Sequence, residues 1–325
     1  MKVLVTGGAG YIGSITSHEL AKSGHEVAVY DSLVHGHEWA VQGLELIVGE
    51  TQDKDFLLKI LKERQIEAVI HFAAFIEVAE SMRDPYQYFQ NNVYGTLQLL
   101  AAMREVGVNK FIFSSSAGVY GNPQRLPIKE DDNKEPTNPY GETKVMVEKI
   151  LSWFEKIHQV HSISLRYFNA AGATLDGKLG EAHDPESHLI PNLLKAALTD
   201  KPVTIFGNDY PTLDGTCVRD YIHVLDLAKA HIMALAALNK TPKSTVYNVG
   251  TGKGYSNKQV LAMIEKVIGK PLKANYASRR PGDAAELVAD SAKLQTELGW
   301  RPQYSDLETI VKTAFSWHKQ SYEWR

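Results

Sequence analysis

The sequence predicts an α/β fold: a doubly wound parallel sheet followed by a smaller mixed α/β domain. Short apolar runs without polar alternation, typical of strands buried on both faces, recur between helical patterns in the first half. The pattern of expected secondary structure changes after residue 169, where loops alternate with shorter helices and strands. We therefore expect one domain over residues 1–165 and a second over 166–325, with parts of 219–249 able to return to the first.

The expected elements follow in order along the chain. Strands are expected at residues 2–6, 26–30, 44–48, 68–72, 110–114 and 162–166, and the helices between them at 12–23, 53–64, 85–106 and 138–158. In the second half, helices are expected at 189–199, 256–268, 291–298 and 305–320, and strands at 203–206, 245–249 and 287–289. Residues 219–238 begin as a strand and continue as a helix. In such a sheet, ligands sit at the carboxyl ends of the strands.

The composition is that of a globular protein. The 325 residues are 44% hydrophobic and 22% charged, with a net charge of −3 and no basic cluster, so no nucleic-acid or membrane partner is expected. The single cysteine, Cys217, excludes an internal disulfide and suits a reducing compartment. The chain opens on a strand pattern rather than a signal peptide, and no apolar run approaches the length of a membrane span. We therefore expect a cytoplasmic location.

A glycine-rich turn follows the first expected strand and opens the first helix. Gly7, Gly10 and Gly13 are spaced so that the backbone can approach a pyrophosphate at the helix N-terminus. Asp31 ends the second strand, where a carboxylate accepts hydrogen bonds from the adenosine ribose. Residues 32–38 contain no Arg or Lys that could hold a 2′-phosphate. This Rossmann-like pattern predicts NAD rather than NADP as the cofactor.

A second pattern with chemical meaning covers residues 138–144. Asn138 and Pro139 suit the start of a helix, which would place Tyr140 and Lys144 on one face. A phenol with an ordinary pKa of about 10 needs a shift of about 3 units, or roughly 4 kcal/mol, to act as a base near neutral pH. A nearby ammonium supplies an energy of that order at an effective dielectric constant of about 20. The pair therefore predicts a tyrosine base.

Several stretches together resemble one protein family. They read TGGAGYIG from residue 6, NNV from 91, FSSSAGVYG from 113, PYGETK from 139, RYFN from 166, FGNDY from 206, RDYIHV from 219 and RRPGD from 279. Each fragment alone is weak, but the set is specific. Over nearly the whole chain it resembles the UDP-glucose 4-epimerase family of the extended short-chain dehydrogenase/reductase superfamily.

The resemblance implies an isomerase with tightly bound NAD that interconverts UDP-glucose and UDP-galactose. Tyr140 would take the proton of the sugar 4-hydroxyl while C4 gives a hydride to NAD⁺. Lys144 would hold the nicotinamide ribose and, together with the cationic ring, lower the tyrosine pKa, and Ser116 would hydrogen-bond the reacting oxygen. The 4-keto sugar would then turn over and regain the hydride on its opposite face. The resemblance also implies a homodimer packed through the helices near residues 86–105 and 140–158.

The same resemblance carries over two sets of binding residues. The cofactor set is Gly7, Gly10, Tyr11, Ile12, Gly13, Asp31, Ser32, Glu50, Thr51, Phe72, Ala73, Ala74, Asn91, Ser114, Tyr140, Lys144 and Phe168. The substrate set is Ser116, Asn169, His188, Leu189, Thr204, Phe206, Arg219, Arg280, Asp283 and Leu287. The two arginines are expected to hold the diphosphate, because a planar guanidinium suits bidentate phosphate contact. No metal is expected, since His35 and His37 have no further ligand at suitable spacing.

Four positions depart from the usual pattern of the family. Glu50 replaces an Asp that meets the adenine, Ile76 replaces a frequent nicotinamide-side Lys, and His188 replaces a common Asn near the uridine. Leu287 occupies the position that gates the 2-substituent of the sugar, where a bulky aromatic residue excludes an N-acetyl group. Because Leu is smaller, we expect some tolerance for UDP-N-acetylhexosamines.

Three alternatives stay open at this point. The first is a 4-epimerase of another UDP-sugar, namely UDP-N-acetylglucosamine, UDP-xylose or UDP-glucuronate. The second is a nucleotide-sugar 4,6-dehydratase, which the sequence argues against, because Ala117 and Gly118 stand where that reaction needs an acidic pair. The third is a nucleotide-binding protein without catalysis, which Ser116, Tyr140 and Lys144 argue against.

Overall fold

The computed structural model describes residues 1–280 and 282–323. Seven parallel strands form its central sheet, in the order β10-β6-β5-β4-β1-β2-β3. The strands are β1 Lys2–Thr6, β2 Glu26–Asp31, β3 Glu45–Val48, β4 Ala68–His71, β5 Lys110–Ser116, β6 His161–Tyr167 and β10 Thr245–Val249. The predicted α/β class with a Rossmann-like parallel sheet is confirmed.

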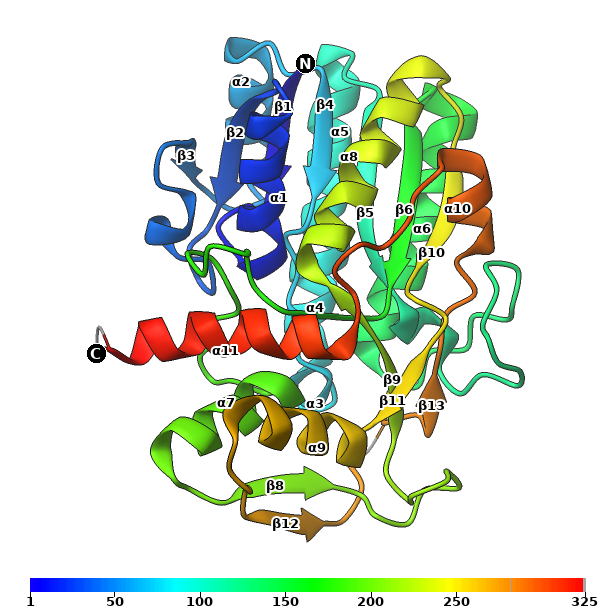
Figure 1. The fold of residues 1–325 in the computed structure, drawn as a ribbon. Helices are drawn as coiled ribbons and strands as arrows, with labels where there is room; N and C mark the ends of the chain where they lie inside the picture. Colours follow the sequence, from blue (N-terminus) through cyan, green and yellow to red (C-terminus); the bar gives the residue numbers. More distant parts are fainter. Residues whose placement is uncertain (281, 324–325) are drawn as a thin grey trace.

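Helices cover both faces of this sheet (Figure 1). One face carries α1 Tyr11–Lys22 and α8 Val224–Lys240, and the other carries α2 Lys54–Glu63, α5 Gly95–Val106 and α6 Pro139–His158. Alternate residues of β1 belong to the two layers, since Val3 and Val5 pack in the core that includes α8 while Leu4 packs in the core that includes α2 and α5. Burial on both faces explains why the strand shows no polar alternation.

A smaller region lies beyond the carboxyl ends of the central strands (Figure 1). Its helices are α7 Leu189–Thr199, α9 Asn257–Ile268 and α11 Leu307–Glu323, which share one hydrophobic core. Its strands are β8 Val203–Phe206 paired with β12 Ala274–Ala277, and β7 Asn169–Ala171, β9 Val218–His223, β11 Gly254–Ser256 and β13 Glu286–Leu287 in a second sheet. The other α-helices in the described part of the chain are α3 Val78–Ser81, α4 Pro85–Tyr88 and α10 Ala292–Leu298.

The chain leaves the large sheet after β6 and later returns to it. After β9, α8 packs beside α1, and β10 then pairs in parallel with β6, with Thr245 opposite Ile163. Residues 224–249 therefore lie with the first half of the chain in space. The division at residues 165 and 166 stays a prediction.

Two expected elements are wrong in detail. Residues 85–106 do not form one α-helix, because a π-helical segment, Phe89–Tyr94, separates α4 from α5. That segment presents the Asn92 amide to both the N–H and the carbonyl of Phe75, at 2.8 and 3.0 Å, a long-range contact that apolar spacing does not reveal. The strand expected at 287–289 is displaced to Glu286–Leu287. The short strands β7, β11 and β12 were not predicted, because three or four residues carry too little periodicity.

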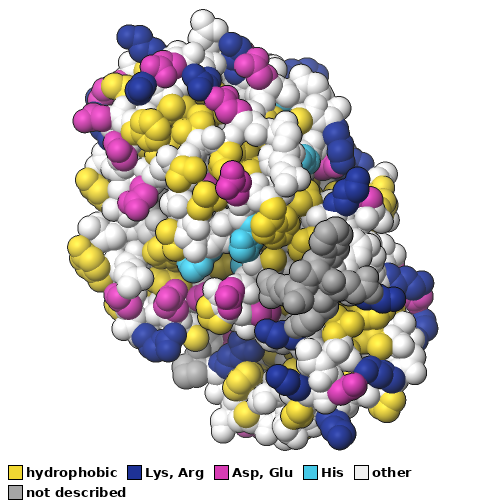
Figure 2. Space-filling model, turned by 90° about the vertical axis from the view of Figure 1, so that its left-hand side faces the viewer, with side chains coloured by type: hydrophobic (Ala, Val, Ile, Leu, Met, Phe, Trp, Pro, Cys, Tyr) yellow, Lys and Arg dark blue, Asp and Glu magenta, His cyan; other side chains and the backbone are white. Residues whose placement is uncertain are grey.

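The surface is mixed in charge on the face that Figure 2 shows, where acidic and basic side chains intermingle around exposed hydrophobic ones. Among the described residues, no helix combines the length and the apolar character that crossing a bilayer requires. Apolar residues also project from the helices on one side of the sheet. Trp153 and Ile157, one turn apart on α6, are 60% and 64% exposed.

Candidate active site

The glycine-rich turn between β1 and α1 lets its backbone come close to neighbouring groups. Gly7 has a φ of +70°, and a Cβ there would lie 2.4 Å from the backbone nitrogen of Ala73. A Cβ on Gly13 would lie 2.1 Å from the Gly7 carbonyl oxygen, whereas one on Gly10 would meet only that oxygen, at 3.5 Å. No side chain caps the N-terminus of α1 at Gly10. The turn therefore offers open backbone N–H groups that fit the pyrophosphate of a dinucleotide.

The carboxylate of Asp31 is fixed beside this turn. Its side chain accepts hydrogen bonds from the backbone N–H of Ala9 at 2.9 Å and of Leu33 at 2.8 Å. Asp31 is buried, while Ser32 after it and Glu50 after β3 are exposed. This places Asp31 at the carboxyl end of β2, where the predicted contact with an adenosine ribose requires it.

The other predicted cofactor residues lie around the same edge of the sheet. Phe72, Ala73 and Ala74 follow β4, Ser114 lies in β5, and Phe168 follows β6. The Ser114 hydroxyl donates to Tyr167 at 2.9 Å. Thr51 is buried after β3, and the Asn91 amide in the π-helical segment donates to Asn92 at 3.0 Å. The structure thus brings these residues to one edge, although their individual roles stay predictions.

Helix α6 supplies the predicted proton acceptor. It begins at Pro139, and the Asn138 side chain caps it by accepting from the Gly141 N–H at 2.8 Å. Tyr140 and Lys144 are both buried on its inner face. The Lys144 ammonium lies 5.6 Å from the centre of the Tyr140 ring and donates to the Ser114 carbonyl at 2.9 Å. The Ser116 hydroxyl accepts from the Gly118 N–H at 3.1 Å and lies close enough to Tyr140 to act on the pKa of its phenol, so the three predicted catalytic side chains meet.

The electrostatics of this group differ from the simple expectation. Burial raises the pKa of the Tyr140 phenol, the neighbouring Tyr167 adds to the shift, and the hydrogen bond with Ser116 opposes it. Burial also lowers the pKa of Lys144 to about 7, against the opposing charge of Glu148. Lys144 alone therefore does not make Tyr140 a base in the protein without its cofactor. A further positive charge beside the phenol is needed, and an oxidised nicotinamide ring carries one.

One acidic residue near Tyr140 was not predicted. Glu77 precedes α3, and its carboxylate accepts a hydrogen bond from the Ser187 hydroxyl at 2.8 Å. Its charge contributes, after burial, to the raised pKa of Tyr140. Residues 73–77 form an irregular segment after β4, so no periodic pattern pointed to this residue.

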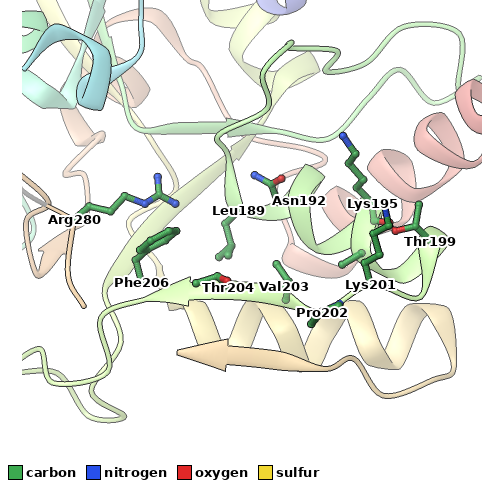
Figure 3. Close-up of a pocket in the computed structure, with 11 residues that line it drawn as sticks. Leu189, Asn192, Lys195, Thr199, Lys201, Pro202, Val203, Thr204, Phe206 and Arg280 are labelled. Carbon is green, nitrogen blue, oxygen red and sulfur yellow. The ribbon is translucent and has the colours of Figure 1, made fainter. Parts of the chain in front are cut away.

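A cavity of about 310 Å³ lies between α7 and β8 (Figure 3). Four predicted substrate residues line it: Leu189, Thr204, Phe206 and Arg280. The Arg280 guanidinium stacks 4.4 Å from the centre of the Phe206 ring. Sequence reasoning missed the other lining residues, which are Asn192, Lys195, Ala196, Thr199, Lys201, Pro202 and Val203. The spacing of 189, 192, 196 and 199 along one helix face was the signal that could have found several of them.

The remaining predicted substrate residues lie outside the lining of this cavity. The Arg219 guanidinium in β9 lies 3.7 Å from the Asp283 carboxylate and donates to the Val218 carbonyl at 2.9 Å. Leu287 in β13 pairs with Arg219 and packs against the core cluster that contains Ala117 and Phe168.

Two further predicted substrate residues, Asn169 and His188, lie in or next to elements of the smaller region. Asn169 lies in β7, opposite Tyr221. His188 immediately precedes α7, and its Nδ1 lies 2.5 Å from the Glu181 carboxylate. The ring of His188 is therefore already engaged by a side chain that the sequence did not suggest as its partner.

Comparison with known proteins gives the class of this chain. Residues 3–250 match the model of the NAD dependent epimerase/dehydratase family. The chain therefore belongs to that family, as the parallel sheet, the glycine turn and the buried Tyr140 and Lys144 suggested.

Within the family, the similarity is to UDP-glucose 4-epimerases, which confirms the resemblance seen in the sequence. The chain is 50% identical to the UDP-glucose 4-epimerase of Lactobacillus helveticus, over 98% of this chain and 97% of that protein. The crystal structure of UDP-glucose 4-epimerase from Brucella ovis in complex with NAD superimposes with a TM-score of 0.93 and 44% identity, covering 97% of each chain. The UDP-Glc/GlcNAc 4-epimerase from Campylobacter jejuni gives a TM-score of 0.85 and 40% identity, covering 98% of this chain and 99% of that one.

Proposed function

We propose that the protein is a UDP-hexose 4-epimerase that uses tightly bound NAD to interconvert UDP-glucose and UDP-galactose. The observation that carries the proposal is the meeting of Ser116, Tyr140 and Lys144 at the carboxyl end of β5, in the same sheet whose first strand ends at the glycine turn. The identity of about one half with an epimerase over nearly the whole chain supports it further. When bound, NAD⁺ supplies the oxidation of the sugar at C4 and its reversal.

The chain's own residues have separate tasks in this reaction. Tyr140 Oη holds and returns the proton of the sugar 4-hydroxyl, and the Ser116 hydroxyl hydrogen-bonds the same sugar oxygen. Lys144 keeps its ammonium beside the phenol through its bond to the Ser114 carbonyl. The net reaction is redox-neutral, so the cofactor need not leave.

The nucleotide is held away from the reacting carbon. Arg280, which lines the cavity and stacks on Phe206, and Arg219 provide two guanidinium groups for the diphosphate. The cavity between α7 and β8 takes the uracil ring. Fixing only the UDP part leaves the oxidised sugar free to present either face.

A panel of UDP-sugars tests this proposal directly. The purified enzyme, without added cofactor, is incubated with UDP-glucose, UDP-galactose, UDP-xylose and UDP-glucuronate, and the products are separated. We expect UDP-glucose and UDP-galactose to interconvert without net reduction of the cofactor. Net cofactor reduction would instead indicate a dehydrogenase, and cofactor binding without turnover of any sugar would indicate a binding protein.

Leu287 favours a second substrate class. Its side chain packs beside Ala117 and Phe168, and a relative of 40% identity is named a UDP-Glc/GlcNAc 4-epimerase. The smaller side chain leaves room for an N-acetyl group, so UDP-N-acetylglucosamine should be converted, and a Leu287→Tyr variant should lose this activity while keeping UDP-glucose. If the wild type does not convert UDP-N-acetylglucosamine even at high enzyme concentration, the hypothesis is wrong.

We also propose that two copies of the chain associate through α5, α6 and the π-helical segment before α5. Trp153 and Ile157 on α6, and Tyr94 and Leu97 at the start of α5, are between 38% and 64% exposed. A second copy laid against these helices would remove this apolar surface from water.

A further inference from the structure

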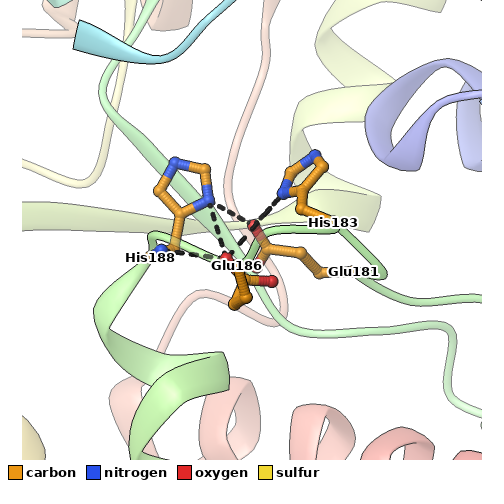
Figure 4. Close-up of side chains that lie close together, drawn as sticks. All are labelled: Glu181, His183, Glu186 and His188. Carbon is orange, nitrogen blue, oxygen red and sulfur yellow. Dashed lines mark hydrogen bonds and ion pairs between the residues drawn. The ribbon is translucent and has the colours of Figure 1, made fainter. Parts of the chain in front are cut away.

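Four potential metal ligands meet in the loop between β7 and α7. Glu181, His183, Glu186 and His188 alternate as acid and imidazole, and one ligand atom from each lies within 4.8 Å of all the others (Figure 4). The loop precedes the helix that lines the nucleotide cavity. Of the four, only His188 was expected near the substrate, and no sequence pattern indicated a metal site here.

The distances fit a compact coordination shell. His188 Nδ1 lies 2.5 Å from Glu181 Oε1 and 3.6 Å from Glu186 Oε1, and the corresponding distances from His183 Nδ1 are 3.2 and 3.9 Å. A tetrahedral zinc ion with bonds of about 2.0–2.2 Å separates its ligand atoms by roughly 3.4 Å. The four separations bracket this value, and the other two are no longer than 4.8 Å, so a central cation requires changes of about 1.4 Å or less in any separation.

The two buried acids of the cluster need compensating positive charge. The side chains of Glu181 and Glu186 are only 5% and 8% exposed, so two carboxylates are removed from water together. Such a pair is stable only when positive charge compensates it. Two protonated imidazoles supply two charges, and so does one divalent ion with both imidazoles neutral, the form in which histidine binds metals.

His183 contributes a buried ring nitrogen that lacks a hydrogen bond. Nδ1 of His183 is shielded from solvent and lies at ion-pair distance from Glu181 and Glu186, at 3.2 and 3.9 Å, but meets the geometry of a hydrogen bond with none of the described residues. Buried polar atoms without a partner are uncommon in folded proteins. A cation at the centre of the cluster would bind this nitrogen.

Hydrogen bonds from surrounding groups orient this loop and one of its potential ligands, as is usual at metal sites. The Trp317 indole N–H donates to the Glu181 carbonyl at 3.0 Å, and the His37 ring bonds the Ala182 carbonyl at 2.8 Å. The Glu186 carboxylate accepts from the backbone N–H of His188, also at 2.8 Å. These bonds fix the backbone of the loop and the orientation of one carboxylate before any ion binds.

We propose that Glu181, His183, Glu186 and His188 form a binding site for one divalent cation of the zinc class. Two imidazole nitrogens and two carboxylate oxygens suit a borderline cation such as Zn²⁺ better than Ca²⁺ or Mg²⁺, which take oxygen ligands. The ion joins the loop to the first turn of α7 and so steadies the helix that carries Leu189 and Asn192 into the cavity. The site does not depend on the proposed epimerase reaction.

Metal titration of the intact protein tests the site. Tag-free, full-length protein that retains its cofactor is dialysed against a chelator and titrated with Zn²⁺ by calorimetry, and with Co²⁺ by visible absorption. We expect one ion per chain and the absorption bands of tetrahedral Co²⁺. The absence of stoichiometric binding of both ions to the folded wild type would overturn the proposal.

Variants locate the bound ion. His183→Gln and Glu186→Gln are each expected to weaken Zn²⁺ binding by more than about tenfold, since even outer-sphere partners cost about 10- to 100-fold. His158→Gln, at an exposed histidine at the end of α6, should bind like the wild type. Equal binding by the folded His183→Gln variant and the wild type would place the ion elsewhere and overturn the proposal. If both variants fail to fold, the Co²⁺ spectrum of the wild type decides: bands of oxygen-only coordination contradict the site.

Discussion

At the scale of single residues, the central feature is a phenol that the protein alone keeps protonated. Burial raises the pKa of Tyr140, and the same burial lowers the pKa of Lys144 to about 7. Both groups are therefore sensitive to a charge brought beside them. An oxidised nicotinamide favours the phenolate, so the base would be generated only when the oxidant is in place.

Removing the phenol hydroxyl tests this assignment. A Tyr140→Phe variant should retain NAD and the fold but lose about 10²- to 10⁴-fold in turnover, the usual range for a positioned acid or base. Epimerisation of UDP-galactose is measured together with the cofactor content of the purified protein. Full activity in this variant would refute the assigned base.

The depressed pKa of Lys144 predicts a pH dependence of stability. Because the folded-state pKa is about 7 and the unfolded value about 10.4, the unfolded chain binds the extra proton between these values. The free energy of unfolding of the cofactor-free protein should therefore rise with pH in this window, by about 2 kcal/mol from pH 7 to pH 9 for this group. Below pH 7 this gain is absent.

The matched variant is Lys144→Met, which lacks the titrating group. Urea denaturation of both proteins at pH 7 and pH 9 isolates the contribution of Lys144, since all other groups titrate in both. The difference between the two proteins should change by about 2 kcal/mol in favour of the wild type. A constant difference would contradict the assigned pKa.

At the scale of elements, α6 is held to the sheet by a buried ion pair. The Arg166 guanidinium in β6 contacts both carboxylate oxygens of Glu148 in α6, at 2.8 and 2.6 Å, and also the Tyr120 hydroxyl at 2.8 Å. The Ser115 hydroxyl donates to the same carboxylate at 2.7 Å. The pair fixes the position of the helix that carries Tyr140 and Lys144.

Breaking this pair on one side should be costly. Arg166→Met leaves Glu148 buried without its cation and should lower the free energy of unfolding by about 3–5 kcal/mol. The double variant Arg166→Met with Glu148→Leu should recover much of this loss, because no buried charge then remains. Denaturant titration measures both. Equal losses in the single and the double variant would show that lost packing, not the orphaned charge, sets the cost.

The sequence predicted the regular elements better than the irregular ones, for physical reasons. The central strands are short apolar runs bounded by turns, and α6 has the cap Asn138 and the starter Pro139, so local chemistry specifies them. The π-helical segment and the short strands depend on long-range contacts, such as the Asn92 amide with Phe75. The same holds for the site residues. Gly7, Asp31 and Tyr140 were predicted because they belong to elements with a sequence pattern. Glu77 and the clustering of Glu181, His183, Glu186 and His188 were missed because these residues lie in loops without periodicity.

At the scale of the whole molecule, the exposed apolar faces of α5 and α6 predict the oligomeric state. The wild type should have the mass of two chains in solution, measured by light scattering. Ile157→Glu places a charge within the proposed interface and should produce monomers. Leu213→Glu, at an exposed residue in the loop between β8 and β9, is the matched control and should leave the mass unchanged. A monomeric wild type would contradict the proposed association.

The central claim is that one sugar is oxidised and then reduced again at the same carbon without release. The direct measurement uses UDP-galactose deuterated at C4, incubated with the purified enzyme in ordinary water, and analysis of the UDP-glucose formed by NMR. The proposed reaction predicts that the product keeps the deuterium at C4 and that the Tyr140→Phe variant forms almost no product. Loss of the label to solvent, with UDP-glucose formed at an undiminished rate, would contradict it.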